Sequence, residues 1–548
     1  MSNTLVNIAS SGIQAAQAAQ NAVANNISNV YVPGYNRQTA QLSEKLTSGI
    51  SGNGVSVTGV SRAYDSLVVN QLRSASSTYA ASSSYYDQIS QINTLLSNTD
   101  SDLSTMVSTF FSSIQSLSSN AQDNAARQTV ISSSQSLVNQ FKSANTYLQN
   151  MDDGINQQLS SSADQINVYA KQIANLNDQI VRQGGGDTSN ALLDQRDQLV
   201  SELNGIVGVT ASVQDNNSVN LTFGNGLTLV QGSSAYQVKA VTSSADPSRS
   251  TLAYDRGTGT PSEIDEKSLT TGSVGGLLSF RSGALDDARN RLGQIALGLA
   301  GSFNETHKLG VDLNGDAGED FFSFSDPTVS ANSKNTGTAV MTVTYSDTSA
   351  VKASDYNVKY SGGAWQVTRA SDGAAVALTP APVTDAAGNT TMSFDGLSVA
   401  ISSGAASNDK YTINTVSNVI NSLNVAITDP AKIAAGLDDS AGGESDNRNA
   451  KALLALQTTK VIGGTATIST AYATLVSNIG TSTSNADVTS TAQSNIVDQL
   501  TERQQSISGV NLDEEYIDLT RYQQYYQANA KVLNTASDVF NSLLSALS

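Results

Sequence analysis

The first 36 residues carry a narrow helical repeat of small and apolar side chains. Its positions are separated by alternating steps of three and four residues, as in the a and d positions of a coiled coil. They are Leu5, Ile8, Gly12, Ala15, Ala19, Ala22 and Asn26, with Ile27 beside them. Because most of these side chains are small, one such helix buries little area and is marginal alone. Pro33 and Gly34 predict its end, since the residue before a proline is pushed out of the helical conformation.

The last 30 residues carry the same spacing with bulkier side chains. The positions are Leu519, Tyr522, Tyr526, Asn529, Leu533, Ala536, Phe540, Leu543 and Leu547. The acidic residues 513–515 come before these positions, at the predicted start of the helix, where the helix dipole favours negative charge. Asn529 is the kind of polar residue that sets register within an apolar seam.

Each stripe alone favours an ordinary amphipathic helix packed on a core. Both chain ends carry the pattern, however, and a bulky stripe complements a small-residue one. We therefore expect the two ends to pair as a coiled coil.

Between the ends, helical and β patterns alternate. Helical character covers residues 64–183, with a seam near residues 155–180 that ends at the glycines 184–186, and a further helix fits residues 192–203, before Gly205. Helical character returns over residues 277–307 and 447–507.

Two stretches show the strict alternation of β-strands. In the smaller one, Val209, Ala211 and Val213 alternate, then Val219, Leu221 and Phe223, with turn signals at residues 215–216 and 225–226. The larger one covers residues 321–416, where Trp365 and Val367 should face Tyr360 and Val358 across a Gly362-Gly363 hairpin.

This order predicts a multi-domain α+β protein. We expect a coiled-coil domain from residues 1–60 and 505–548 and a helical rod from residues 61–206, 271–320 and 437–504. Residues 207–270 and 321–436 would then be inserted β lobes. Nested insertion keeps the two termini together.

Composition excludes several classes of function. The 548 residues include no Cys and one His, and the net charge is -18 with only 29 Lys and Arg. A thiol nucleophile, a Cys-ligated metal and phosphate-driven nucleic-acid binding are therefore not expected. The sequence has no run of about 18 apolar residues, so no membrane span is predicted. The first 36 residues carry no charged side chain, so they lack the basic start of a secretory signal.

Candidate chemical groups are few, and each has a simpler explanation. Asp312, Asn314, Asp316 and Glu319 imitate part of a calcium loop, but Gly315 and Ser323 stand where that loop needs other residues, and a turn is favoured. His307 has no His or Cys partner, which favours a helix-end or packing role. The pairs Asp152-Asp153 and Asp286-Asp287 are expected on solvated helix faces. No catalytic, cofactor or metal site is expected, and an enzyme is not predicted.

Several segments resemble the flagellar axial proteins. Residues 25–38 (NNISNVYVPGYNRQ) resemble their N-terminal signature, through Asn25, Asn26, Asn29, Pro33, Gly34 and Tyr35. Residues 508–515 (SGVNLDEE) and 522–533 resemble their C-terminal signature. Residues 192–199 (LLDQRDQL), the stretch from 275 to 322 and residues 446–450 (DNRNA) narrow the resemblance to the family of hook-associated protein 1. It is weakest in the two β stretches.

The resemblance implies a structural role outside the cell, in the flagellum. Such proteins are exported through the flagellar type III channel without a cleaved signal peptide and join hook to filament. The terminal helices polymerise with other copies, the hook protein lies below and hook-associated protein 3 lies above. An export chaperone holds the C-terminal helix. The residues alone also allow a secreted acidic binding module with adhesive β lobes, or another axial protein of hook or rod type.

Overall fold

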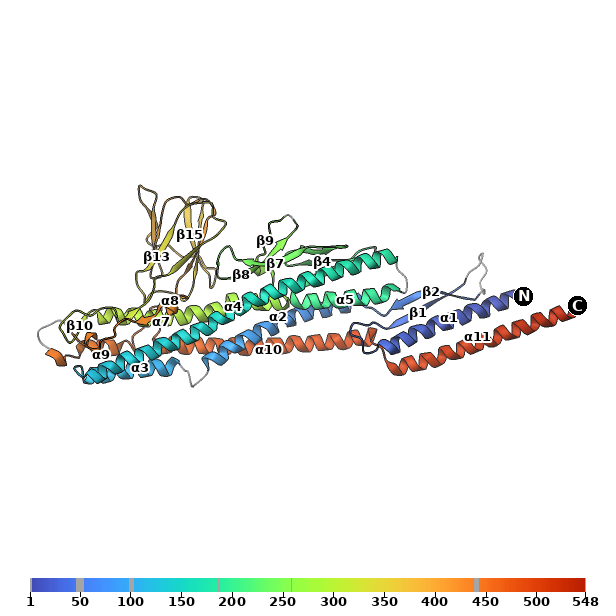
Figure 1. Cartoon of the computed structure of the whole chain (residues 1–548), viewed down its shortest axis with the longest axis horizontal. Coiled ribbons are helices and arrows are strands. Elements are labelled where there is room, and N and C mark those ends of the chain that lie inside the picture. Colours follow the sequence, from blue (N-terminus) through green and yellow to red (C-terminus); the bar gives the residue numbers. More distant parts are fainter. Residues whose placement is uncertain are drawn as a thin grey trace.

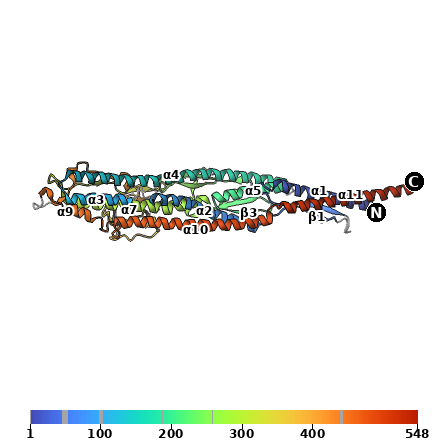
Figure 2. The ribbon, with the colours of Figure 1, turned by 90° about the horizontal axis from the view of Figure 1, so that it is seen from below.

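A computed structural model describes residues 2–45, 54–97, 103–184, 188–257, 259–437 and 443–547. The molecule is elongated, with long helices side by side along its axis (Figures 1 and 2). Helices α1 (Ser2–Asn29) and α11 (Leu512–Leu547) project from one end, where both termini lie. Two β lobes stand on one side of the rod (Figure 1). The predicted α+β class is confirmed.

The rod is a bundle of helices from both halves of the chain. Its helices are α2 (Ser66–Leu96), α3 (Leu103–Ser119), α4 (Asn124–Gln183), α5 (Thr188–Ile206), α6 (Gly272–Phe280), α7 (Asp286–His307), α9 (Arg448–Ala455) and α10 (Ile468–Ser508). A π-helical turn, Arg281–Leu285, joins α6 to α7. Helix α4 alone spans 60 residues, which is about 90 Å at 1.5 Å per residue.

The seam predicted near residues 155–180 lies on α4 and runs through the centre of the rod core. Ile155, Leu159, Ile166 and Ile173 are fully buried. Asp123 caps the start of the helix, and Gly184 ends it in the left-handed conformation at φ 66°, as the glycine run predicts. Spacing therefore located the buried face of this helix, and the glycine run located its end.

The smaller lobe lies on α4. One sheet contains β3 (Val209–Val213), β4 (Val219–Phe223), β5 (Leu227–Gln231) and β6 (Ser234–Ala235), and the other contains β7 (Gln237–Thr242), β8 (Ser250–Asp255) and β9 (Ser262–Glu263). Two asparagines of α4 bind backbone at these strands. Asn177 accepts from Val219 N (3.0 Å) and donates to its carbonyl (2.8 Å), and Asn167 makes the same pair of bonds with Val238.

The larger lobe is a sandwich of two antiparallel sheets. Their strand orders are β12-β19-β14-β15 and β13-β18-β17-β16. The strands are β12 (Thr328–Ala331), β13 (Met341–Tyr345), β14 (Tyr356–Ser361), β15 (Ala364–Arg369), β16 (Val383–Thr384), β17 (Thr390–Phe394), β18 (Leu397–Ile401) and β19 (Lys410–Asn414). Val358 pairs with Val367 and Tyr360 with Trp365, so the predicted hairpin is confirmed.

The larger lobe packs closely against helix α7. Leu297 of α7 belongs to the lobe core. A Cβ on Gly293 would lie 2.8 Å from the carbonyl carbon of Val416, and one on Gly301 would lie 2.6 Å from Cβ of Thr348. Glycine at these two positions allows the lobe to approach this near, through the Val416 backbone at Gly293 and through the Thr348 side chain at Gly301.

Short strand pairs tie the far end of the rod together. β10 (Gly310–Val311) pairs with β21 (Gly436–Leu437), and β11 (Phe322–Ser323) pairs with β20 (Asn424–Val425). Both pairs join segments that flank the larger lobe in sequence, so the lobe enters and leaves the rod at one place.

The structure differs from the predicted elements at three places. Strands β1 (Gln38–Glu44) and β2 (Val55–Arg62) form an antiparallel hairpin that was not predicted, although Val55 and Val57 alternate with polar residues. Residues 456–467 interrupt the helix expected over residues 447–507, between α9 and α10. Gly205 lies inside the last turn of α5, which ends at Ile206.

Candidate functional site

The terminal helices α1 and α11 lie side by side along their length (Figures 1 and 2). On α1, Ala15, Ala19 and Ala22 are buried, Ile8 and Ile27 are half-buried, and Leu5 is exposed. The buried part of the predicted seam is therefore its small-residue centre.

The predicted seam of α11 is much less covered. Ala536 is buried; Leu519, Tyr522, Asn529 and Leu533 are half-buried; Tyr526 and Phe540 are exposed. The side chains of Leu543 and Leu547 lie outside the described residues. One small-residue helix cannot cover the bulky stripe, so much apolar area of α11 stays in contact with water.

Asn529 fits over a helical residue that has no side chain. Its amide lies directly against Gly12 of α1, where a Cβ would stand 2.8 Å from Nδ2. Nδ2 also donates to the Tyr525 carbonyl at 2.9 Å. A side chain at position 12 would displace the Asn529 amide from its place against α1. The polar residue of one seam and the glycine of the other thus meet at one level of the pair.

Asn26 is the hub of a polar cluster where the terminal pair joins the rod. We call this the junction cluster: Asn26, Tyr35, Asn36, Arg37, Arg62, Asp194, Asp197, Glu515 and Asp518. Asn26 Nδ2 donates to Glu515 Oε2 and to the Gln38 carbonyl, both at 2.9 Å. Its Oδ1 accepts from Tyr35 OH and from Gln38 N, both at 2.8 Å. All four bonds that an amide side chain can make are formed.

Arg37 neutralises the acidic start of α11. Its Nε donates to Glu515 Oε1 at 2.6 Å, and its guanidinium is 3.4 Å from Asp518. The hydrogen bond to Glu515 raises the pKa of Arg37, and burial opposes this. Burial, and then the charges of Asp194 and Glu515, raise the pKa of Tyr35 to about 12, so its hydroxyl stays a donor.

The other half of the cluster binds the N-terminal loop to the rod. Asn36 donates to Asp194 of α5 through both Nδ2 (2.5 Å) and its backbone N (3.2 Å). Arg62 pairs with Asp194 at 2.9 Å and with Asp197 at 2.8 Å. Burial raises the pKa of Asp194, and the bonds from Arg62 and Asn36 oppose that rise.

Three sequence blocks far apart in the chain therefore meet at one point. Residues 25–38, 192–199 and 508–515 supply both sides of the junction cluster. Sequence alone singled out these blocks, but not the contacts between them. The Asn26–Glu515 bond joins residues 489 positions apart.

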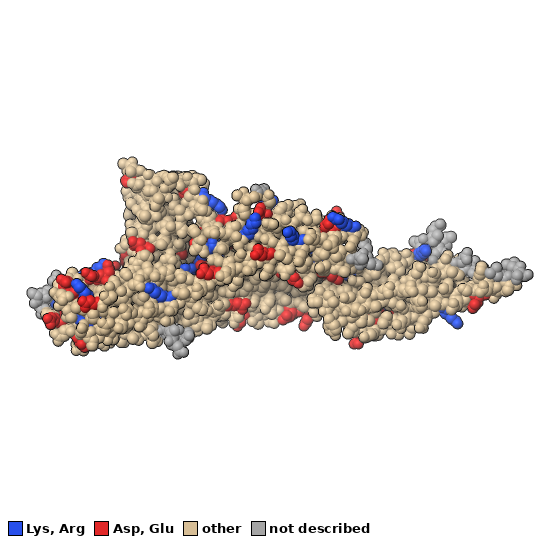
Figure 3. Space-filling model, viewed as in Figure 1, with Lys and Arg blue, Asp and Glu red and all other residues tan. Residues whose placement is uncertain are grey.

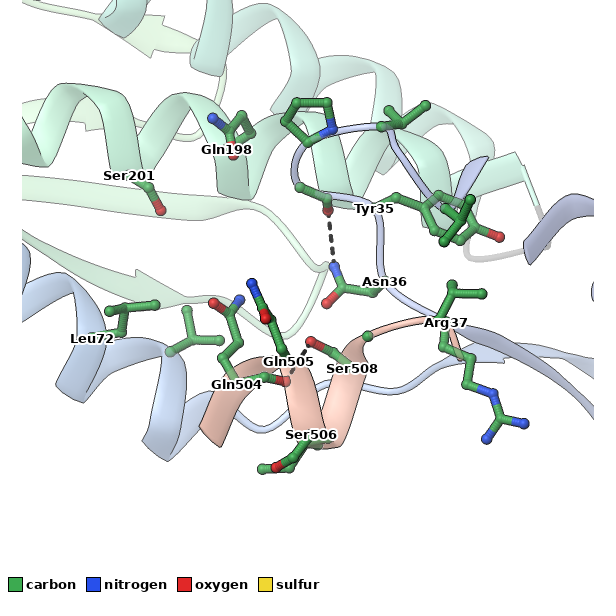
Figure 4. A pocket seen from close by; sticks show the side chains of 18 of the residues that line it. Tyr35, Asn36, Arg37, Leu72, Gln198, Ser201, Gln504, Gln505, Ser506 and Ser508 are labelled. Carbon is green, nitrogen blue, oxygen red and sulfur yellow. Dashed lines mark hydrogen bonds between the residues drawn. The ribbon is translucent and has the colours of Figure 1, made fainter. Parts of the chain in front are cut away.

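A polar cavity of about 770 Å³ opens beside the junction cluster (Figure 4). The N-terminal loop forms one wall, and Gln198 and Ser201 of α5 and Gln504 and Ser508 of α10 form others. Of the remaining motif residues, Asn25, Pro33 and Gly34 are exposed and Asn29 donates to the Asn25 carbonyl. Gly34 has φ +79°, a conformation that glycine adopts without strain.

His307 has a packing role at the far end of the rod. It is fully buried, with Nδ1 2.7 Å from the Glu319 carbonyl and Nε2 2.8 Å from Ala434 N. Burial lowers its pKa, so the ring is neutral, with Nδ1–H donating and Nε2 accepting. Both ring nitrogens are used, which leaves none to bind a metal.

The acidic loop after α7 is a closed turn. Asp312 Oδ1 accepts from Asn314 N (2.7 Å) and Asp316 N (3.0 Å), and Lys432 lies 3.6 Å from its other oxygen. Burial raises the pKa of Asp312, but these N–H donors and Lys432 outweigh it and hold the pKa below its usual value. Among the described residues, no three His, Asp or Glu side chains are grouped as metal ligands.

One expected surface carboxylate is buried. Asp152 was predicted on a solvated face, but it is buried on α4, where Arg249 (3.2 Å) and Arg289 (3.0 Å) pair with it. The inserted lobe and α7 supply these arginines, and neither is near in sequence. Asp153 is exposed as expected, whereas Asp286 and Asp287 are half-buried and paired with Arg249 and Arg291.

Comparisons with known proteins cover nearly the whole chain. The model for the helical domain of flagellar hook-associated protein FlgK matches residues 89–322, and the D2-like domain of flagellar hook-associated protein 1 matches residues 330–415. Models of a flagella basal body rod protein and of the FlgEFG C-terminal region match residues 7–36 and 503–546. Flagellar hook-associated protein 1 of Escherichia coli (strain K12) is 51% identical over 550 residues, which covers 99% of each chain. The chain belongs to the flagellar hook-associated protein 1 family.

Two further likenesses agree with this family. Flagellar hook-associated protein 1 of Salmonella typhimurium is 50% identical over 555 residues, again with 99% of each chain covered. The flagellar hook junction protein FlgK from Burkholderia pseudomallei has a similar structure, with a TM-score of 0.75 and 27% identity over 80% of this chain and 100% of that one. The chain is a structural protein of the bacterial flagellum, at the hook–filament junction, in a family that is not enzymatic. No helix among the described residues is long and apolar enough to cross a membrane.

Proposed function

We propose that the protein builds the hook–filament junction by polymerising through its terminal helix pair, residues 1–60 with 505–548. The rod and the two lobes then form the outer body of each subunit. One observation supports this most strongly: α11 presents a second apolar seam that the described residues of the same copy leave exposed.

The second seam repeats every seven residues on the exposed side of α11. Tyr525, Val532 and Val539 are 53%, 42% and 47% exposed. The small residues Ala528, Thr535 and Ser542 follow each of them by three positions and are also exposed. This a/d spacing is that of a helix that packs against another helix. We infer that the partner is a terminal helix of a second copy.

The charge distribution supports burial of this region in an assembly. Between residues 522 and 547, Lys531 and Asp538 are the only charged residues. The space-filling view shows few charged side chains over the terminal pair, whereas many lie over the rod and at the base of the lobes (Figure 3). A weakly charged pair can enter a packed tube without leaving many unpaired charges.

The family suggests the partners. We infer that the hook protein lies on one side of the junction and hook-associated protein 3 on the other, with copies of this chain between them. The exposed apolar stripe of α11 also suits an export chaperone that covers it before assembly. Export through the flagellar type III channel, without a cleaved signal peptide, is consistent with a first stretch of 36 residues that carries no charge.

Charged substitutions on the two α11 seams test the proposal. We expect Val532→Asp on the second seam, and Leu533→Asp or Phe540→Asp on the first, to abolish incorporation and filament attachment of the protein that is secreted. An unpaired charge would be buried in the assembled interface. The measurement is the ratio of assembled to secreted protein in cells that express each variant.

Asn534→Asp is the matched control. Asn534 is exposed on the same helix, away from both seams, and the substitution adds the same charge. We expect it to assemble normally. Normal incorporation of Val532→Asp would show that the second seam is not an interface.

A further inference from the structure

The second seam of α11 alternates large and small side chains. Its a positions hold the large residues and its d positions hold the small ones. They are Tyr525, Val532 and Val539 at a, and Ala528, Thr535 and Ser542 at d. All six are exposed in the single copy. The Thr535 hydroxyl donates to the Lys531 carbonyl at 3.0 Å, so its methyl group is free to pack against a partner.

Lys531 and Asp538 lie beside this seam, one heptad apart. Both take position g, next to the d residues, and both are exposed. They are the only charged residues between 522 and 547, and their charges have opposite signs. Among the described residues, neither forms an ion pair. Both charges are therefore available to a molecule that approaches the seam.

We propose that two copies of the free chain pair through this seam as an antiparallel coiled coil. In this arrangement an a residue of one helix packs against a d residue of the other, and position g faces position g. Lys531 of each copy then lies against Asp538 of the second copy. The pairing is two-fold symmetric, so the same ion pair forms twice.

The register that pairs these charges also matches the sizes of the side chains. Each layer of the coiled coil joins a large residue of one copy to a small residue of the other. The layers are Val532 with Thr535, Val539 with Ala528, and Tyr525 with Ser542. Because every layer has a similar total volume, the two helices can keep one separation along the seam, which is about 27 Å long at 1.5 Å per residue.

A parallel pair in register has neither match. Each side chain would face its own counterpart, tyrosine on tyrosine and alanine on alanine, so that wide and narrow layers would alternate. Position g would approach position e of the partner, which is Asn529 or Ala536. Neither residue carries a charge, and Ala536 is already buried within its own copy. Size and charge therefore both favour the antiparallel orientation.

The shape of the molecule leaves room for this contact. Helices α1 and α11 project beyond the rod (Figure 1), so a second copy that runs the opposite way overlaps the terminal pair alone, with the two rods at opposite ends. The dimer is closed, because each seam covers the other. It would hide from assembly the seam that assembly uses. This last consequence rests on the proposed function, whereas the dimer itself does not.

Exchange of the two charges tests the pairing in the purified full chain. Sedimentation velocity at low salt, over a series of concentrations, should show a monomer–dimer equilibrium for the parent. Lys531→Asp or Asp538→Lys should raise the dissociation constant about tenfold or more, because two attractive contacts become repulsive. The double variant Lys531→Asp/Asp538→Lys should dimerise as the parent does. So should an equimolar mixture of the two single variants, since each then supplies the charge that the other lacks.

Ser537→Asp is the control for these variants. Ser537 is exposed at position f, on the side of α11 away from the second seam, and the substitution should leave the dissociation constant unchanged. Circular dichroism establishes that each variant is folded. A parent that stays monomeric at every concentration would overturn the proposal. Parent-like dimerisation of Lys531→Asp would also overturn it.

Disulfide trapping tests the orientation. The chain has no Cys, so Tyr525→Cys and Ser542→Cys each introduce a single thiol. A mixture of the two variants, treated with copper phenanthroline, should form a disulfide between positions 525 and 542, which lie about 25 Å apart along one helix. A dimer of Tyr525→Cys linked to itself at position 525 would show a parallel pair and overturn the proposal.

The proposed function is read separately, from the incorporation of Val532→Asp in cells. If this variant fails to incorporate and the purified parent is monomeric, the dimer is refuted and the proposed assembly stands. If the parent dimerises through position 538 and Val532→Asp incorporates normally, the dimer stands and the proposed assembly is refuted.

Discussion

Helices α4 and α11 carry similar side chains, but the seam of α4 is buried and that of α11 is largely exposed. Both carry long apolar seams in a helix otherwise rich in Ser, Gln and Asn. Along α4, Ile155, Leu159, Ile166 and Ile173 are completely buried. Along α11, Glu515 and Ala536 are the only fully buried residues among those described.

The difference comes from the number of neighbours. Helix α4 is surrounded by α3, α5, α7 and the smaller lobe, whereas among the described residues α11 packs mainly against α1, with Arg37 of the N-terminal loop at its start. A seam can be buried in one copy only if that copy supplies enough surface to cover it. The rod therefore buries its seam within one copy, and in the proposed assembly the terminal pair would gain its remaining burial from another molecule.

The largest expected effect is a charge in the rod seam. Ile166→Asp should lower the free energy of unfolding by about 4 kcal/mol or more, because it buries an unpaired carboxylate and removes apolar packing. Val532→Asp, on the exposed seam of α11, should change it by less than about 0.5 kcal/mol in the monomer. Urea unfolding of purified monomer, followed by circular dichroism, measures both. Equal decreases in the free energy of unfolding for the two variants would show that the α4 and α11 seams do not differ in burial within the monomer.

A smaller effect is expected at the junction cluster. Asn26→Ala removes a donor from the buried carboxylate of Glu515 and should cost about 2–3 kcal/mol in local stability. Amide hydrogen exchange should become faster in α1 and α11 but not in α4. Asn25→Ala, one residue away and exposed, should leave exchange unchanged. Faster exchange throughout α4 would show that the cluster stabilises the rod as well.

The smallest effect is a pH dependence confined to the rod. Because burial lowers the pKa of His307, the unfolded chain binds a proton near pH 6.5 before the folded chain does. Its stabilisation is present above pH 6.5 and is lost as pH falls, by about 1.4 kcal/mol for each unit of pKa lowering. The difference in Tm between the parent and His307→Gln should shrink from pH 7.5 to pH 5.5. A constant difference would mean that the His307 pKa is the same in the folded and unfolded chains.

Local patterns predicted the long elements well. Spacing located the α4 seam, the Gly184 stop and the Tyr360–Trp365 hairpin pair. The β1–β2 hairpin escaped prediction because Gln38–Glu44 has little apolar alternation and is held by its partner strand. Asp152 was misplaced because the arginines that bury it, Arg249 and Arg289, come from a lobe and a helix about 100 or more residues away.

For the candidate site, too, the sequence identified residues but not the contacts between them. The motif pointed to Asn26 and Tyr35 but could not say that they meet Glu515, since no local rule relates residues at opposite ends of a chain. Nor could spacing separate the two faces of α11. Tyr526 belongs to the predicted seam and Tyr525 to the second seam, yet they are neighbours in sequence.

Sequence by itself determined where most of the long helices lie, which residues form the predicted seams, and that both chain ends match. Those properties follow from side-chain periodicity and from the conformational limits of glycine and proline, which act over a few residues. Tertiary structure alone decided where Asn26 finds its acceptors, why Gly12 faces Asn529, and which apolar residues stay exposed. These depend on how far the surface of one copy extends, and the described part of one copy leaves much of α11 exposed.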